Sequence, residues 1–99
     1  GQSGKNGIIE VDLHIDSLLD DTHGMSNSEI LNYQLDKFRE VIEANKEKRE
    51  QKIVFIHGKG DGVLRKAIID ELKRKYNNCR YQDASFQEYG FGATMVTIK

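Results

Sequence analysis

Residues 52–65 read KIVFIHGKGDGVLR, and this stretch decides the fold. Its first part, residues 52–57, contains the continuous apolar run that is typical of a central parallel strand buried on both faces. Glycines at residues 58–62 then predict a tight turn. A helix follows from about residue 62 or 63 to Tyr76, because Leu64, Ile68 and Leu72 recur at helical spacing.

Upstream of this stretch, residues 8–14 (IIEVDLH) alternate apolar and polar side chains, which predicts a strand with one apolar face. Residues 15–25 are acidic and contain a glycine, and we expect a loop. Ser26 and Glu29 form a capping-box pattern that predicts the start of a helix. The apolar stripe of this helix consists of Leu31, Leu35, Phe38 and Ile42.

Downstream, residues 79–83 are predicted to form a short third strand and residues 93–98 (ATMVTI) the last strand. The loop between them carries Phe86, Tyr89 and Phe91, and we expect at least two of these rings to pack on the sheet. Right-handed crossovers make the first three strands parallel, and a short connection makes the fourth antiparallel.

The predicted fold is therefore α/β, with the order β-α-β-α-β-β in two layers. We expect a four-stranded mixed sheet with two helices on one face, because two helices cannot cover both faces. The other face is expected to be partly open and to carry Glu10, Asp12 and His14.

Composition limits the class of protein. The 99 residues suit a single domain, with 37% hydrophobic and 31% charged residues. Residues 1–7 (GQSGKNG) resemble a flexible linker or cloning remnant, so residues 8–99 are the expected domain, cut from a longer protein with other domains. No apolar run is long enough to span a membrane. One cysteine, Cys79, favours a reducing cytoplasm.

A net charge of −1 gives no overall attraction to nucleic acid, so any nucleic-acid site must be a local basic patch. Ligands in open α/β sheets bind at the carboxyl ends of parallel strands. Asp12, His14 and His57 lie at the ends of two predicted strands. We expect them to converge with the glycine turn on one rim of the sheet.

On that rim His14 suits acid–base chemistry near neutral pH, and Asp12 suits orienting it or holding a metal. The alternative is a surface histidine at a strand end. His57 has a structural alternative too, in which it caps the loop by hydrogen bonding. His14, His23, His57 and Asp12 are conceivable zinc ligands, but no short ligand spacing supports a zinc site. No cofactor is predicted, and the sequence leaves open whether the domain binds a divalent metal ion.

The glycine turn between strand and helix suits an anion, because backbone amides and a helix N-terminus favour negative charge. Lys59 and Arg65 add positive charge, and Arg65 can grip a phosphate with two donors. The G-x-G-x-G spacing matches neither the dinucleotide fingerprint nor the P-loop. A plain tight turn is the alternative.

Three stretches together resemble the Smr (small MutS-related) domain family. Residues 11–14 (VDLH) resemble its LDLHG signature, residues 57–65 (HGKGDGVLR) resemble its HGKGxGxLR core, and residues 90–96 (GFGATMV) resemble its closing GGxGATxV. The similarity extends from about Ile8 to Lys99. One departure is Ile15, which stands in place of the signature glycine and adds bulk beside His14.

The resemblance implies a fold akin to the C-terminal domain of translation initiation factor three, and binding to DNA or RNA. Some members nick nucleic acid, and others act on ribosomes or messenger RNA. By position, Asp12 and His14 become the catalytic pair of an endonuclease, a hydrolase. The implied nucleic-acid and phosphate contacts are His57, Gly58, Lys59, Gly60, Gly62, Arg65, Gly90 and Gly92.

Three functions stay open from the sequence. The first is a nucleic-acid-binding domain that also cleaves phosphodiester bonds. The second is a module that binds nucleic acid or the ribosome without cleaving, which the neutral net charge and Ile15 favour. The third is a protein-interaction module that uses the open face of the sheet.

Overall fold

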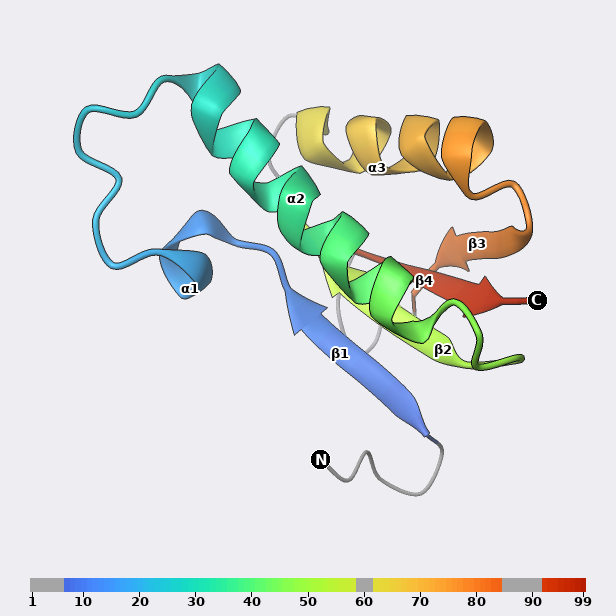
Figure 1. The fold of residues 1–99 in the computed structure, drawn as a ribbon. Helices are drawn as coiled ribbons and strands as arrows, with labels where there is room; N and C mark the ends of the chain where they lie inside the picture. Colours follow the sequence, from blue (N-terminus) through green and yellow to red (C-terminus); the bar gives the residue numbers. More distant parts are fainter. Residues whose placement is uncertain (1–6, 59–61, 85–91) are drawn as a thin grey trace.

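One mixed sheet is formed by four strands, β1 (Ile8–Asp12), β2 (Lys52–Ile56), β3 (Cys79–Asp83) and β4 (Ala93–Ile98). The computed structural model describes residues 7–58, 62–84 and 92–99, and the strands lie in the order β1-β2-β4-β3 (Figure 1). β1 and β2 are parallel, and β4 is antiparallel to both of its neighbours. The first three strands therefore run in one direction, as predicted.

Two helices, α2 (Asn27–Asn45) and α3 (Val63–Lys75), cover one face of the sheet (Figure 1). α2 begins as its sequence predicts: the amide of Glu29 donates to Ser26 Oγ at 3.2 Å, and the amide of Ser26 donates to Glu29 Oε1 at 2.8 Å. α3 begins after Gly62, whose φ of +82° suits a glycine. The predicted two-layer α+β architecture is confirmed.

The chain between β1 and α2 differs from the expected loop. Residues Ile15–Leu18 form a single-turn helix, α1, and the amide of Ser17 donates to the carbonyl of His14 at 2.9 Å. β1 also ends at Asp12 rather than at His14, because the Asp12 side chain accepts the backbone N–H of His14 and turns the chain.

The main core lies between the helices and the sheet. Ile53 and Phe55 of β2 are fully buried there, and the ring of Phe55 meets Phe38 of α2 edge-on with 4.8 Å between centroids. Val54 points to the other face and joins a smaller buried cluster with Ala84 and Ala93. β2 is therefore buried on both faces, as its apolar run predicts. The second face is only partly open, and Glu10 and Asp12 are exposed there.

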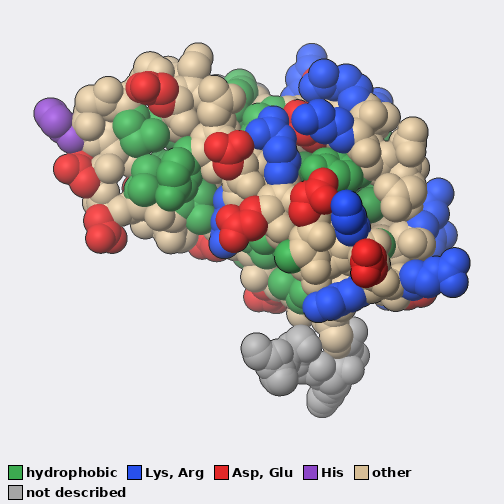
Figure 2. All heavy atoms as spheres, in the orientation of Figure 1, with side chains coloured by type: hydrophobic (Ala, Val, Ile, Leu, Met, Phe, Trp, Pro, Cys, Tyr) green, Lys and Arg blue, Asp and Glu red, His purple; other side chains and the backbone are tan. Residues whose placement is uncertain are grey.

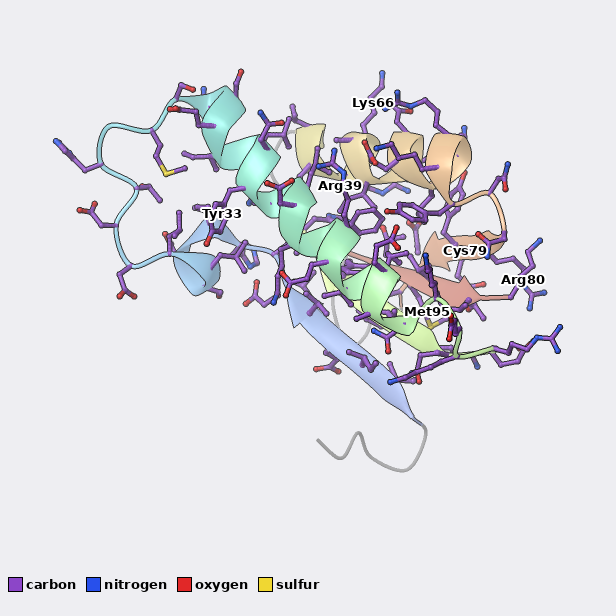
Figure 3. All side chains as sticks on the ribbon, in the orientation of Figure 1. Tyr33, Arg39, Lys66, Cys79, Arg80 and Met95 are labelled. Atoms are coloured by element: carbon purple, nitrogen blue, oxygen red, sulfur yellow. The ribbon has the colours of Figure 1, made fainter. Side chains whose placement is uncertain are left out.

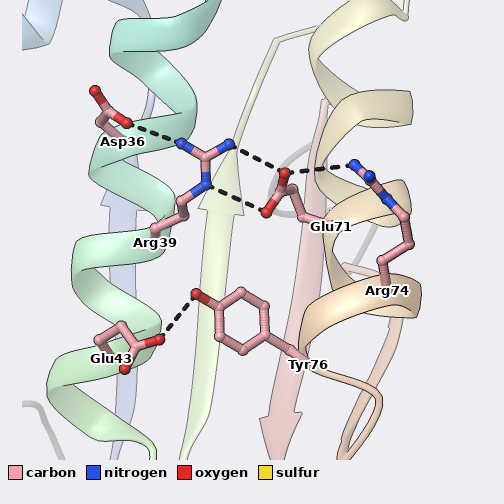
Figure 4. Close-up of polar contacts among 6 residues, drawn as sticks. All are labelled: Asp36, Arg39, Glu43, Glu71, Arg74 and Tyr76. Atoms are coloured by element: carbon pink, nitrogen blue, oxygen red, sulfur yellow. Dashed lines mark hydrogen bonds and ion pairs between the residues drawn. The ribbon is translucent and has the colours of Figure 1, made fainter.

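An ion pair joins α2 to α3 (Figure 4). The guanidinium of Arg39 on α2 donates from Nε and Nη2 to the carboxylate of Glu71 on α3, at 3.2 and 3.0 Å. Arg74 lies 3.6 Å from the same carboxylate, and Asp36 accepts from Arg39 at 2.8 Å. The side chain of Glu71 is nearly buried, and its hydrogen bonds from Arg39 outweigh that burial and lower its pKa.

Candidate functional site

An aspartate–histidine pair lies where β1 ends. Oδ1 of Asp12 accepts the backbone N–H of His14 at 2.9 Å and lies 2.7 Å from its ring Nδ1. A carboxylate acceptor at Nδ1 favours the tautomer that carries the proton there. Nε2 then bears the lone pair, and among the described residues it has no hydrogen-bond partner. About half of each side chain is exposed, so the pair is accessible to a ligand.

Residues around the pair hold it in place. Leu13, between the two, is fully buried; its amide donates to the carbonyl of Ile56 at 2.9 Å, and its carbonyl accepts from Gln34 Nε2 of α2 at 2.8 Å. The hydroxyl of Ser17 on α1 donates to Oδ2 of Asp12 at 2.9 Å. Both carboxylate oxygens therefore accept hydrogen bonds, which fixes the plane of the carboxylate.

These contacts also set the charge of Asp12. Partial burial acts to raise its pKa, but the hydrogen bonds from the His14 backbone, from Ser17 and from the His14 ring outweigh burial, and the pKa lies below its usual value. The carboxylate therefore stays ionised near neutral pH. The ionised carboxylate lies against Nδ1 of His14 and holds the ring in one orientation.

Gly58, two residues after the end of β2, lies against His14. Its φ is +83°, and a Cβ at this position would lie 2.7 Å from Nε2 of His14. The amides of His57 and Gly58 both donate to the carbonyl of Gly92, at 2.8 and 2.9 Å. The end of β1, the end of β2 and the start of β4 therefore meet at one rim.

His57 lies beneath this rim and is mostly buried. Its Nδ1 is 3.1 Å from the carbonyl of Gly58, and its Nε2 is 2.9 Å from the hydroxyl of Thr94. Both ring nitrogens thus face protein atoms. This agrees with the structural alternative for His57, in which the ring caps the loop by hydrogen bonding. Burial is the main reason that its pKa is lowered, so the ring is neutral near neutral pH.

Arg65, in the first turn of α3, reaches across to β3. Its Nη2 lies 2.9 Å from Oδ1 of Asp83, and both side chains are largely exposed. Such a surface pair is weak, so a phosphate can compete with Asp83 for the guanidinium. Sequence reasoning missed Asp83 and Ser17, because neither belongs to a motif and each meets its partner only in the folded chain.

The model of the Smr domain family matches residues 20–99. The chain belongs to the Smr domain family. The matched residues include the 57–65 and 90–96 stretches and begin after Asp12 and His14.

Similar proteins include the endonuclease MutS2 of Clostridium tetani, 37% identical over 81 residues, which are 80% of this chain and 10% of that protein. The endonuclease MutS2 of Finegoldia magna is 39% identical over 69 residues, which are 68% of this chain and 8% of that protein. The endonuclease MutS2 of Clostridium beijerinckii is 49% identical over 47 residues, which are 48% of this chain and 6% of that protein. The chain thus spans a tenth or less of the length of these relatives.

Some predicted contacts of this Smr domain lie outside the described residues, namely Lys59, Gly60, Gly90 and the aromatic residues 86, 89 and 91, as do residues 1–6. Within the described ranges, no three His, Cys, Asp or Glu side chains come together as a metal site. His14, His23, His57 and Asp12 therefore do not assemble as joint ligands. No helix in the described part of the chain is long and apolar enough to cross a membrane.

Proposed function

We propose that this Smr domain binds DNA or RNA at the rim formed by Asp12, His14 and Gly58 and nicks a phosphodiester bond there. The observation that carries the proposal is the geometry of the pair: Oδ1 of Asp12 lies 2.7 Å from Nδ1 of His14, and Nε2 faces Gly58. The relatives reported above are named endonucleases, which supports the same reaction.

Phosphodiester hydrolysis needs a proton removed from the attacking water and a proton supplied to the leaving oxygen. Nε2 of His14 can accept the first in the neutral ring or donate the second in the protonated ring. Asp12 is a positioning residue in this scheme. Its carboxylate fixes the tautomer and orientation of the ring and stabilises the imidazolium that forms.

Phosphate binding is assigned to side chains and to the N-terminus of α3 rather than to the Gly58 amide. That amide already donates to the Gly92 carbonyl, so Gly58 contributes the space in which the His14 ring lies. The first turn of α3, which follows Gly62, favours an anion, and Arg65 in that turn adds a fork of N–H donors. On the basis of the sequence, Lys59, Gly60 and Gly62 are further proposed phosphate contacts.

A module that binds nucleic acid without cleaving it is the second candidate. Ile15 stands beside His14 where the family signature has glycine, and it is the first residue of α1. Its side chain is half-buried rather than fully exposed. If the isoleucine restricts approach to Nε2, the rim still binds phosphate, but the scissile bond stays out of reach.

Titration separates the two candidates. The purified domain is titrated with single-stranded, duplex and branched DNA and with structured RNA, while backbone amide shifts are followed by NMR, and each mixture is then assayed for cleavage products. Shifts centred on residues 12–15, 57–58, 62–65 and 92, together with cleavage, support the endonuclease. The same shifts without cleavage support the binding module. The absence of shifts with every ligand at low salt would contradict both candidates. It would favour a protein-interaction module instead.

A further inference from the structure

Acidic and basic side chains are unevenly distributed between the two ends of the folded molecule. The end that holds α1 and the start of α2 carries mainly carboxylates, and Lys and Arg side chains are most frequent over α3 and at the end that holds the C-terminus, with some carboxylates between them (Figure 2). In the described residues the acidic side chains of the first region are Asp12, Asp16, Asp20, Asp21, Glu29 and Asp36. A protein with a net charge of −1 therefore has a strongly positive region.

The centre of that region is a row of exposed side chains across the sheet. Lys52 of β2 pairs with Thr97 of β4, and Thr97 pairs with Arg80 of β3. Paired residues of neighbouring strands point to the same face, so Lys52 and Arg80 share one face of the sheet, two strands apart. Arg80 extends from β3 into solvent beside the C-terminus (Figure 3).

The loop between α2 and β2 adds to this row. The amide of Glu50 donates to the carbonyl of Ile98 at 2.7 Å, and the amide of Ile98 donates to the carbonyl of Gln51 at 2.9 Å, which holds the loop against the end of β4. Lys48 and Arg49 are exposed in this loop, and Lys99 is exposed directly after β4. We call Lys48, Arg49, Lys52, Arg80 and Lys99 the basic end.

Carboxylates do not neutralise the basic end. Glu47 and Glu50 lie in the same loop, and Glu50 approaches Arg80 at 3.9 Å. Both partners of this pair are more than 60% exposed, so water screens the attraction. Glu10 of β1 is exposed on the same face of the sheet as Lys52, one same-face position along from Ile8, which pairs with Lys52. Five cations against three carboxylates leave a positive surface, and none of the exposed large hydrophobic side chains of the described residues belongs to it.

We propose that the basic end is a second binding surface for the phosphate backbone of nucleic acid, remote from the aspartate–histidine pair. The proposal rests on the nucleic-acid binding proposed above. Separate, exposed cations without an apolar centre suit a polyphosphate better than a protein surface. Carboxylates at the α1 end repel phosphate, so nucleic acid that reaches the rim is expected to extend toward the basic end.

The spacing of the two surfaces fits one continuous ligand. Gly58 follows Lys52 by six residues along one extended segment, which corresponds to about 20 Å at the rise of a strand. This is about six base pairs of duplex at roughly 3.4 Å each. A longer duplex can therefore contact the rim and the basic end together.

The test is the salt dependence of binding to a 24-base-pair DNA duplex. The variants are Lys52→Gln, Arg80→Gln and the double variant that carries both substitutions. Lys37→Gln of α2 is the matched control. Each replaced cation of the basic end is expected to reduce the slope of log affinity against log salt by about 1, and to weaken binding about fivefold at 0.1 M salt. Lys37→Gln is expected to leave the slope unchanged. Amide shifts at residues 48–52, 80 and 99 accompany binding.

An unchanged slope in the double variant, or an equal loss in Lys37→Gln, overturns the proposal while leaving binding at the rim intact. Shifts at the basic end without shifts at residues 12–15 overturn the rim function and keep the second surface. A wild-type chain that binds no duplex at low salt contradicts both. Melting temperatures of the variants confirm folding; Lys52 and Arg80 are exposed, and Lys37 is half-buried.

Discussion

A methyl group on Gly58 would lie 2.7 Å from Nε2 of His14. The glycine after β2 therefore defines the space in which the imidazole of β1 sits, although the two residues are far apart in the sequence. The contact joins the two strongest motifs of the chain and explains in physical terms why this turn begins with glycine: φ is +83°, and a side chain has no room.

Replacement of Gly58 by alanine is expected to displace the His14 ring. The positive φ alone costs about 1 kcal/mol of unfolding free energy, and the contact with the ring adds to it. Urea unfolding measures the stability, and the ring signals of His14 in NMR spectra report its position. Gly24→Ala is the matched control, since φ is +84° there and nothing lies within 4 Å of a Cβ. Unchanged His14 signals in Gly58→Ala would show that the ring does not depend on this glycine.

Asp12→Asn is expected to change the tautomer of His14. An amide at this position can donate to Nδ1, which moves the ring proton to Nε2 and removes the proton acceptor that the reaction needs. If the domain nicks DNA, the rate is expected to fall by about 10²–10⁴-fold with little change in binding. ¹⁵N shifts of the ring report the tautomer, and Asp16→Asn on α1 is the control. Retention of both the tautomer and the rate would remove Asp12 from the mechanism.

Glu71→Gln is expected to destabilise the fold by about 2–3 kcal/mol at pH 7, because the Arg39 guanidinium loses the nearly buried one of its two carboxylate partners. The pKa of Glu71 is lowered in the folded chain, so its stabilisation is present above the ordinary pKa of a glutamate and is lost as the pH falls through the folded value. The difference between wild type and variant should therefore shrink below about pH 4.

Urea titrations at several pH values measure this difference, with Asp36→Asn as the control. Asp36 also accepts from Arg39 but is largely exposed, so its loss is expected to cost less than about 1 kcal/mol. A difference for Glu71→Gln that persists unchanged at low pH would contradict the assignment of the stabilisation to this carboxylate.

Local patterns predict much of the fold. The capping box at Ser26 and Glu29 is a contact between residues three apart, so the start of α2 can be read from the sequence. The apolar run of β2 and the alternation of β4 likewise follow from the environment of each strand. The placement of β4 between β2 and β3 is a long-range result and was not part of the prediction.

The features that were not predicted from the sequence are short or depend on residues that are distant in the chain. α1 has four residues and no side-chain cap, so no periodic signal marks it. Its residue Ser17 nevertheless holds the carboxylate of Asp12. The Arg65–Asp83 pair joins α3 to β3 and has no signature in spacing. The candidate pair itself was predicted, because Asp12 and His14 lie close together in the sequence.

The central claim is that His14 performs the chemistry of a nuclease, and it is tested most directly by nicking of a supercoiled plasmid. Wild type, His14→Ala and His23→Ala are compared at equal concentrations, with duplex binding measured in parallel. His23 is an exposed histidine in the loop before α2, so its variant controls for loss of a surface imidazole. The account predicts nicking by wild type and His23→Ala and its loss in His14→Ala, with binding retained. Nicking by His14→Ala at the wild-type rate would contradict it.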